Sequence, residues 1–158
     1  MSIKTCNTCS ATTKRGTQCT KRTCVSDLCW IHLKQQGFRI KDSVIPGAGK
    51  GLFVLKEYAP NENITLYTGD ESKDPIDGVY VLKINNQLYI DGAKTDEPGL
   101  GRWINQCRTN QQRNRLCNNN SKFSYDYRNQ KTNIKATRRI PAGQEVFLSY
   151  GPSYWNQV

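Results

Sequence analysis

Most of the side chains in this chain that could bind a metal lie near its N-terminus. Five of the seven cysteines fall within the first 29 residues, and the only histidine follows closely, in the order Cys6, Cys9, Cys19, Cys24, Cys29 and His32. In a reducing compartment, such clustering indicates a metal site rather than disulfides. The Cys29-x-x-His32 spacing is a natural half-site for zinc, which binds thiolate and imidazole ligands tetrahedrally. We therefore expect one structural zinc ion in this segment.

Two ligand sets fit the spacing, and the sequence leaves both open. The first has even gaps between its cysteines and consists of Cys9, Cys19, Cys29 and His32. The second pairs Cys6-x-x-Cys9 with Cys29-x-x-His32, and Cys24 is a further alternative ligand. An unstructured tail whose cysteines bind no metal is the remaining alternative. The segment up to about Leu33 has no sustained apolar periodicity, so it needs a metal or a host domain to fold.

A second group of residues that could bind a ligand is a run of alternating glycines. Gly47, Gly49 and Gly51 lie within P-G-A-G-K-G-L-F. A Rossmann dinucleotide site would need a helix after the glycines, but here they lead into the strand-like run G-L-F-V-L, which excludes that site. A simple turn between strands also explains them. Glycines beside a strand nevertheless allow a bulky ligand to approach the backbone closely.

Two further segments lie downstream. Residues 101–108 read G-R-W-I-N-Q-C-R, and about thirty residues later N-I-K-A-T-R-R-I-P-A-G-Q-E-V-F-L-S-Y-G ends on Tyr150 and Gly151. The chain has no Ser-His-Asp order and no H-E-x-x-H motif, and its single histidine belongs to the cysteine cluster. These patterns do not indicate a hydrolase or a zinc protease.

The elements that must position these residues are mostly short strands. Runs of β-forming residues alternate with turn signals, and they predict strands at Phe38–Lys41, Gly51–Leu55, Ile64–Tyr67, Val79–Ile84, Leu88–Ile90, Lys122–Tyr127, Asn133–Ala136 and Val146–Tyr150. Asn85-Asn86 reads as a hairpin turn. The one convincing helical stretch is Gly99–Gln106. The sequence predicts a mostly β fold, with Cys107 and Cys117 as ordinary small apolar residues beside a polar loop.

Composition indicates one domain with a small appendage. The chain has 158 residues, 36% of them hydrophobic, and a formal net charge of +10. Residues 1–41 hold eight Lys and Arg against one Asp, whereas residues 42–158 hold fifteen against twelve acidic residues. This basic end indicates contact with a polyanion such as nucleic acid or a nucleosome, and simple solubilisation is the alternative. No run long enough to span a membrane and no secretion signal is apparent, so we expect a soluble nuclear or cytoplasmic protein.

The glycine turn, the R-x-x-N segment and the terminal tyrosine after a G-x-E strand, in this order, resemble the SET-domain protein lysine methyltransferases. The resemblance covers roughly residues 39–154. It implies a SET fold of several short β-sheets with a knot-like C-terminal segment, occupying residues 37–158 after a zinc module at 1–36. The brevity of the chain resembles the compact viral type that methylates a host histone. The N-terminal stretch resembles a small Cys3His module of viral and phage proteins, which favours the first ligand set.

The resemblance also implies roles for individual residues. The cofactor S-adenosylmethionine would contact Ala48, Gly49, Lys50, Gly51, Arg102, Asn105, Gln106 and Trp155. Tyr150 would lie at the methyl-transfer site with Tyr67 beside the substrate lysine, and Phe123 would line the lysine channel. Gln106 departs from the histidine usual in the family. Either Trp155 or Tyr154 would cover the adenine, because the family's C-terminal zinc clip is missing.

The resulting prediction is an S-adenosylmethionine-dependent methyltransferase that acts on protein lysine, with a histone tail as the expected substrate. Methyl transfer requires alignment in a narrow channel more than acid–base groups, which agrees with the absence of a hydrolytic triad. The main alternative is a non-catalytic chromatin or nucleic-acid binding protein with a degenerate SET scaffold. A purely structural zinc-binding interaction protein is a third. The sequence leaves the target lysine, the methylation state and the oligomeric state open, including a homodimer.

Overall fold

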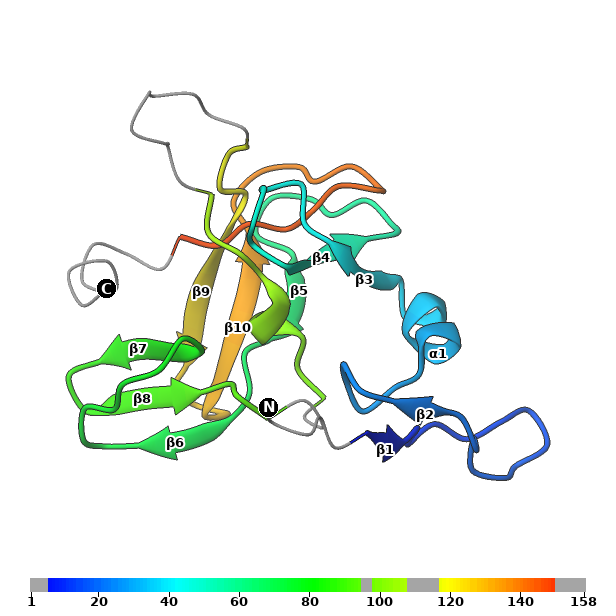
Figure 1. Ribbon diagram of the computed structural model, residues 1–158. Coiled ribbons are helices and arrows are strands. Elements are labelled where there is room, and N and C mark those ends of the chain that lie inside the picture. The colour runs from blue at the N-terminus through cyan, green and yellow to red at the C-terminus, as the bar shows by residue number, and fades with distance from the viewer. Residues whose placement is uncertain (1–5, 95–97, 108–116, 150–158) are drawn as a thin grey trace.

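The computed structural model describes residues 6–94, 98–107 and 117–149. Its strands form small antiparallel sheets, the largest of which has the strand order β5-β10-β9 (Figure 1). That sheet comprises β5 (Asn63–Leu66), β10 (Lys131–Ala136) and β9 (Ser121–Asp126). A second sheet has the order β6-β8-β7, with β6 at Asp70–Ser72, β7 at Val81–Asn85 and β8 at Leu88–Asp91. The mostly β prediction is therefore confirmed.

A third sheet has two strands, β3 (Phe38–Asp42) and β4 (Lys50–Val54). The sheet β5-β10-β9, here called the central sheet, lies between this sheet and β6-β8-β7 (Figure 1). The edge of β4 that does not pair with β3 contacts the segment around Glu145, where Val146 N–H donates to the carbonyl of Leu52 at 2.8 Å. The short 3-10 helix η1 (Gly101–Trp103) falls within the predicted helical stretch. The core between these elements includes the fully buried Leu52, Ile134, Ile140, Val146 and Leu148.

The N-terminal module is built from β1 (Asn7–Thr8), β2 (Arg22–Thr23) and α1 (Trp30–Gln35). It joins β3 through Gly37, whose φ of 90° is the left-handed conformation that commonly ends a helix. The sequence did not predict α1, because six residues are too few to show an amphipathic period. Among the described residues, no helix has the length and apolar character needed to span a bilayer.

Several sequence-based expectations are corrected by the structure. Residues 146–149 form no continuous strand but only isolated bridges, such as Asn105 with Phe147 and Ser121 with Leu148. The turn between β7 and β8 falls at residues 86–87, where Gln87 N–H donates to the side-chain oxygen of Asn85 at 2.8 Å. The end of the expected knot-like segment, residues 150–158, lies outside the described residues.

The expectation that no cysteine forms a disulfide is wrong for four residues. Pairing of β1 with β2 places Asn7 opposite Thr23, so the next residues outward, Cys6 and Cys24, face each other with their Cα atoms 4.3 Å apart and form a disulfide. Cys107 and Cys117 form a second disulfide across a Cα separation of 5.7 Å. Both Cα separations lie in or at the edge of the range that disulfides bridge. Neither position follows from the sequence spacing, because tertiary pairing brings the residues together.

Candidate metal centre and cofactor site

Four side chains of the N-terminal module converge on one point. The ligand atoms of Cys9, Cys19, Cys29 and His32 all lie within 4.8 Å of one another. The Nδ1 atom of His32 lies 3.4 Å from the Sγ of Cys9 and 3.3 Å from that of Cys29. Ligands at zinc bond lengths in a tetrahedron lie roughly 3.5–3.8 Å apart, so these residues fit a zinc ion with three thiolates and one imidazole.

Local structure explains this convergence. Cys9 N–H donates to the carbonyl of Lys21 at 2.8 Å and Cys19 N–H donates to that of Ala11 at 2.8 Å, which folds the two cysteines toward each other. Cys29 directly precedes α1, and His32 follows in its first turn. The backbone N–H of Cys29 donates to the sulfur of Cys9 at 3.2 Å. Such N–H donors stabilise sulfur in its thiolate form, which is the metal ligand.

The acid–base properties of the thiols differ across the cluster. Burial raises the pKa of Cys29, but hydrogen bonds from the backbone and ring of His32, the backbone of Ile31 and the thiol of Cys9 lower it to about 7. The Lys21 backbone lowers the pKa of Cys19, whereas burial and the neighbouring Cys9 and Cys29 raise it further, so its net shift is upward. Of these two thiols, Cys29 is therefore the better prepared to ionise at neutral pH.

The alternative ligand set that includes Cys6 does not form. The disulfide to Cys24 occupies the sulfur of Cys6, and the same bond removes Cys24 as a ligand. Cys9, Cys19 and Cys29 are free thiols, and all three are buried. The structure thus favours the ligand set of Cys9, Cys19, Cys29 and His32 over the set that includes Cys6.

The glycine turn presents open main chain beside β4. Gly47 and Gly49 have φ angles of 77° and 76°, and a Cβ added to either would meet no atom of a described residue within 4 Å. Their left-handed conformation suits glycine, and the space above them could accept a ligand. Gly51 differs, because a Cβ there would collide with the carboxylate of Glu145. Ala48 and Lys50 lie between these glycines, so the four predicted cofactor residues share one turn.

Asn105 joins the glycine turn to the rest of the site. Its amide nitrogen donates to the backbone carbonyl of Lys50 at 2.9 Å and to Glu145 Oε1 at 3.3 Å. Its own carbonyl accepts from Leu148 N–H at 3.0 Å. Asn105 therefore anchors both the turn and the chain that leads toward residue 150. Gln106 follows it and is partly buried.

Glu145 is a site residue that sequence reasoning did not single out, although it is the acidic residue of the G-x-E pattern. It is 4% exposed, and its carboxylate accepts from Ser43 Oγ at 2.7 Å and from Val44 N–H at 2.8 Å. Together with the bond from Asn105, these contacts link three segments that are far apart in the sequence. A buried carboxylate that accepts several hydrogen bonds fixes the positions of its partners.

Arg102 lies in η1, which precedes Asn105, and carries buried hydrogen-bond donors. Its guanidinium lies 4.3 Å from the ring centre of Tyr80 and 4.6 Å from that of Trp103. Its Nε and Nη1 atoms are buried and have no hydrogen-bond partner among the residues that the structure describes. Buried donors without partners are costly, so an acceptor such as the carboxylate of an amino-acid ligand would stabilise this arrangement. The open glycine turn and these donors fit a cofactor with an amino-acid end.

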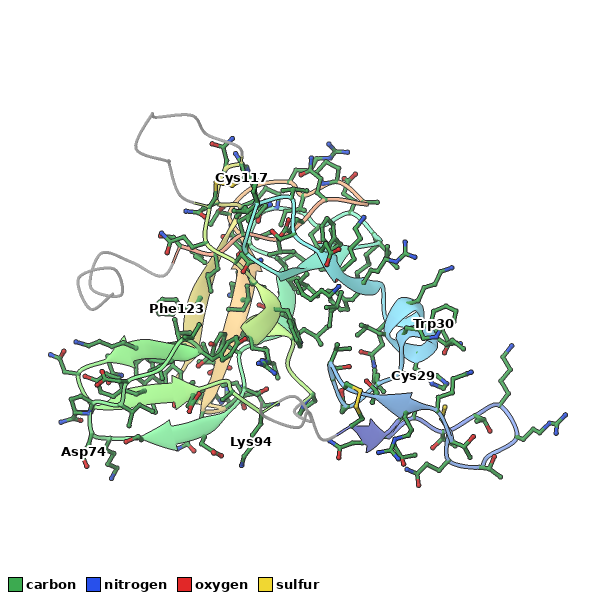
Figure 2. The ribbon with its side chains drawn as sticks, viewed as in Figure 1. Cys29, Trp30, Asp74, Lys94, Cys117 and Phe123 are labelled. Atoms are coloured by element: carbon green, nitrogen blue, oxygen red, sulfur yellow. A yellow bond between two sulfur atoms is a disulfide. The ribbon has the colours of Figure 1, made fainter. Side chains whose placement is uncertain are left out.

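The two residues expected near the substrate lie on the central sheet. Tyr67 directly follows β5, is 3% exposed, and donates its hydroxyl hydrogen to the carbonyl of Tyr80 at 2.6 Å. Phe123 lies on β9 and packs against the core, well away from Cys29 in the N-terminal module (Figure 2). The strand β10 separates β5 from β9, so Tyr67, at the end of β5, and Phe123, on β9, lie on opposite sides of that strand.

The start of β9 also contacts the segment that leads to Tyr150. Ser121 N–H and Ser121 Oγ donate to the carbonyl of Phe147 at 3.0 Å and 2.9 Å. Tyr150, Tyr154 and Trp155 themselves lie outside the described residues. The structure thus brings together the glycine turn and Asn105, and it joins Ser121, two residues before Phe123, to Phe147.

Comparison with known proteins agrees with this arrangement. A family model described as the SET domain matches residues 48–151. Among solved structures, the chain is similar to the methyltransferase domain of human PR domain-containing protein 2, with a TM-score of 0.53 and 18% sequence identity over 72% of this chain and 76% of that one. Among curated proteins, none matches significantly. With its small antiparallel sheets, glycine turn and R-x-x-N segment inside the matched region, the chain belongs to the SET-domain family.

Proposed function

We propose that the protein is a protein lysine N-methyltransferase that uses S-adenosylmethionine. Members of the SET-domain family use this cofactor and act on protein lysines, and the family match covers residues 48–151. The observation that carries the proposal is the bond from Asn105 Nδ2 to the carbonyl of Lys50, which holds an open glycine turn in place. Ala48, Gly49, Lys50 and Gly51 would contact the cofactor mainly through their main chain. Arg102 and Asn105 would bind its amino-acid end, with Gln106 and Trp155 toward the adenine.

When bound, the cofactor's sulfonium supplies the methyl group, so this chain must align the substrate amine and remove its solvent. In the proposal, Tyr150 and Tyr67 flank the substrate nitrogen and Phe123 limits the width of the channel. The Tyr67 hydroxyl donates a hydrogen bond to the backbone carbonyl of Tyr80, so toward the substrate its oxygen can act only as an acceptor. Such an oxygen can accept weak C–H···O contacts from a polarised methyl group or a hydrogen bond from the substrate amine. Burial of the amine in the channel promotes loss of its proton.

The proposed substrate is a histone tail, with the N-terminal module as the part that positions the enzyme on chromatin. The support for this proposal is the charge of residues 6–41. Basic side chains in this range are exposed, among them Lys14, Arg15, Lys21 and Arg22, and Asp27 is its one acidic residue. A zinc ion bound by Cys9, Cys19, Cys29 and His32 would hold together the fold of this module, residues 1–36, which precedes the SET domain of residues 37–158. A histone substrate would place the protein in the nucleus. If the protein is viral, this would be the nucleus of the host cell.

A non-catalytic chromatin reader is the second candidate. It is favoured by Gln106, Cys107 and Arg108, where the family commonly has His, Ser and Cys. The disulfide from Cys107 to Cys117 adds a constraint directly after Asn105. Retention of the bond from Asn105 to the glycine turn argues for the enzyme.

One experiment separates the two candidates. The full chain is incubated with methyl-labelled S-adenosylmethionine and core histones, and mass spectrometry locates the label. Label on a lysine, lost in the Asn105→Ala variant but kept in Asn129→Ala, supports the enzyme, because Asn129 is an exposed asparagine in the β9–β10 turn. Cofactor binding by calorimetry without any labelled product, combined with tight nucleosome binding, supports the reader.

A further inference from the structure

A small apolar pocket lies where the N-terminal module meets the SET domain. It is lined by residues from the module, from β3 and from the end of β4, namely Val25, Trp30, Leu33, Lys34, Phe38, Arg39, Ile40 and Leu55. Its volume of about 270 Å³ is below the range of about 300–1,000 Å³ typical of cofactor and drug-sized ligands. The size is suited instead to one large side chain of a partner. The pocket does not include the glycine turn or Asn105, so it is separate from the proposed methyl-transfer site.

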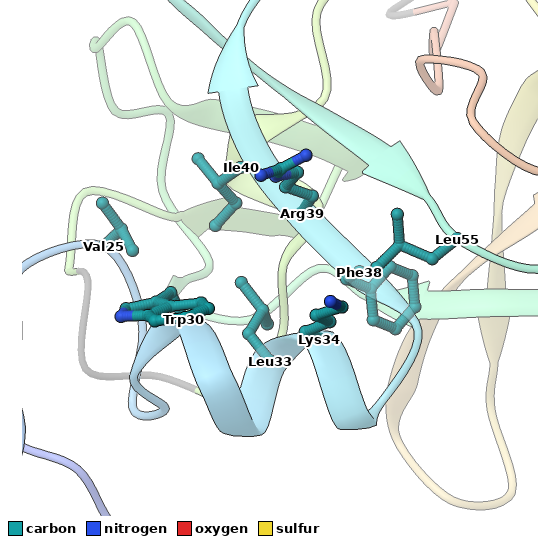
Figure 3. A pocket seen from close by; sticks show the side chains of 8 residues that line it. All are labelled: Val25, Trp30, Leu33, Lys34, Phe38, Arg39, Ile40 and Leu55. Carbon is teal, nitrogen blue, oxygen red and sulfur yellow. The ribbon is translucent and has the colours of Figure 1, made fainter.

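The pocket exposes apolar surface that no described residue covers. The side chain of Trp30 is 70% exposed, although tryptophan is usually at least partly buried. Trp30, Leu33 and Lys34 project from one side of α1 toward β3, as Figure 3 shows, because residues three and four apart share a helix face. Leu55 borders the other end of the pocket and is 36% exposed. Exposed tryptophan beside an apolar hollow is typical of the anchor points in protein interfaces.

The charge at the rim indicates the chemistry of the partner. Lys34 and Arg39 are exposed, and neither forms an ion pair with any residue of the described ranges. Other cations do have partners: Lys50 pairs with Asp42 and Arg139 with Glu57. No carboxylate is among the pocket residues. Two cations without counter-ions beside an apolar hollow match an apolar side chain flanked by acidic residues.

The strand β3 provides a third feature. It pairs with β4 alone in a two-stranded sheet, so its other edge has no strand partner among the described residues. Arg39 and Ile40 on this strand line the pocket. An extended peptide can add its backbone to such an edge while one of its side chains enters the neighbouring pocket.

We propose that this pocket is a docking site for an extended acidic peptide segment of a partner protein, with one bulky apolar side chain inserted beside Trp30. Single-stranded nucleic acid fits less well. Its phosphates would match Lys34 and Arg39, but the polar edges of a base would find mainly apolar side chains in the pocket and would lose their hydrogen bonds. The site would recruit a partner or substrate protein independently of methyl transfer.

Binding of fluorescently labelled synthetic peptides to the full chain tests the proposal. The probes are short Glu/Ser peptides with a central Phe, Leu or Trp, the same peptides with a central Ala, versions with Lys in place of Glu, and an oligo-dT strand. We expect the acidic peptides with a bulky centre to bind, and binding to weaken with added salt. Trp30→Ala, and separately Lys34→Glu with Arg39→Glu, should each weaken binding at least about tenfold. These side chains are exposed, so the variants should fold normally.

Matched controls come from a second surface hollow, on β6, β8 and β9, that includes the exposed Tyr127 and Lys73. Tyr127→Ala and Lys73→Glu should leave peptide binding unchanged. The proposal is overturned if no acidic peptide binds, if the variants at Trp30, Lys34 and Arg39 bind as well as the wild type, or if the central Ala peptide binds equally. Loss of oligo-dT binding in the same variants, without peptide binding, would assign the surface to nucleic acid instead.

Discussion

At the scale of single residues, Glu145 has the most connected side chain of the cofactor site. Its two oxygens accept from Ser43 Oγ, Val44 N–H and Asn105 Nδ2. The same carboxylate packs where a Cβ on Gly51 would lie, so the glycine is required for the glutamate to fit. The Glu145 carboxylate therefore holds the glycine turn on the side of Gly51, while Gly47 and Gly49 leave the main chain of the turn open.

Glu145→Gln tests this role. The amide nitrogen of glutamine cannot accept, so at least one of three donors would lose its partner in a buried place. We expect the free energy of unfolding to fall by about 1–3 kcal/mol and S-adenosylmethionine affinity to fall with it, measured by denaturant unfolding and calorimetry. Glu62→Gln is the control, because Glu62 also accepts a backbone N–H, at 2.8 Å from Ala59, but on the surface. Equal effects of the two changes would contradict the special role of Glu145.

Tyr150→Phe tests the assignment of the transfer residue. The change removes one hydroxyl and almost no volume. If this hydroxyl contacts the reacting groups, turnover should fall by orders of magnitude while the melting temperature and cofactor affinity stay close to wild type, because the interaction is made mainly in the transition state. Phe123→Tyr should instead narrow the channel and stop the reaction at fewer methyl groups, as read by mass spectrometry. Normal turnover by Tyr150→Phe would show that another tyrosine has this role.

At the scale of elements, the cysteines of the N-terminal module divide into two kinds. Pairing of β1 with β2 joins Cys6 to Cys24, whereas the loops between and after these strands bring three free thiols to His32 at the start of α1. With two residues per strand and one six-residue helix, the module has little regular structure of its own. Small modules of this kind depend on a metal or a disulfide for stability.

Elemental analysis of variants distinguishes the two kinds of cysteine. The wild type should hold about one zinc per chain, and Cys9→Ser or Cys29→Ser should lose it, because three ligands with a missing thiolate bind zinc far less tightly. Cys6→Ser is the matched control, since its sulfur is in the disulfide, and it should keep the zinc. Loss of zinc in Cys6→Ser but not in Cys19→Ser would restore the alternative ligand set.

At the scale of the whole molecule, one hydrogen bond connects the module to the cofactor site. The indole nitrogen of Trp103 donates to the carbonyl of Val25 at 2.8 Å. Trp103 belongs to η1 and lies two residues before Asn105, and Val25 lines the proposed docking pocket. A partner bound in that pocket would thus contact residues adjoining the element that holds the glycine turn.

Trp103→Phe removes this bond and keeps an aromatic ring in place. We expect the free energy of unfolding to fall by about 1 kcal/mol, the usual size for a neutral hydrogen bond. Hydrogen exchange should become faster in the module, at residues 22–36, while β9 and β10 stay protected. Trp30→Phe, in the same module but exposed, should change neither quantity. Unchanged module exchange in Trp103→Phe would mean that other contacts hold the module in place.

The sequence by itself determined the residue types and the local elements. Cysteine spacing indicated zinc, runs of β-forming residues between turn signals predicted β3 to β5 and β7 to β10 within a few residues, and the order of three motifs indicated the family. The strand signals are local, since each depends on neighbours only a few positions apart. The zinc and family signals need only the order and spacing of residue types along the chain. The zinc ligand set, in contrast, remained a choice between alternatives until the fold brought four ligand atoms within 4.8 Å.

Only the tertiary structure decided the features that join distant segments. The register of β1 and β2 selected the Cys6–Cys24 disulfide, and the bonds of Glu145 to Ser43 and Val44 span about a hundred positions of sequence. The pocket between α1 and β3 likewise arises from packing, as do the buried donors of Arg102, which have no partner within the described ranges. Burial and hydrogen-bond satisfaction depend on which segments meet, and that information is spread over the whole chain rather than held in any motif.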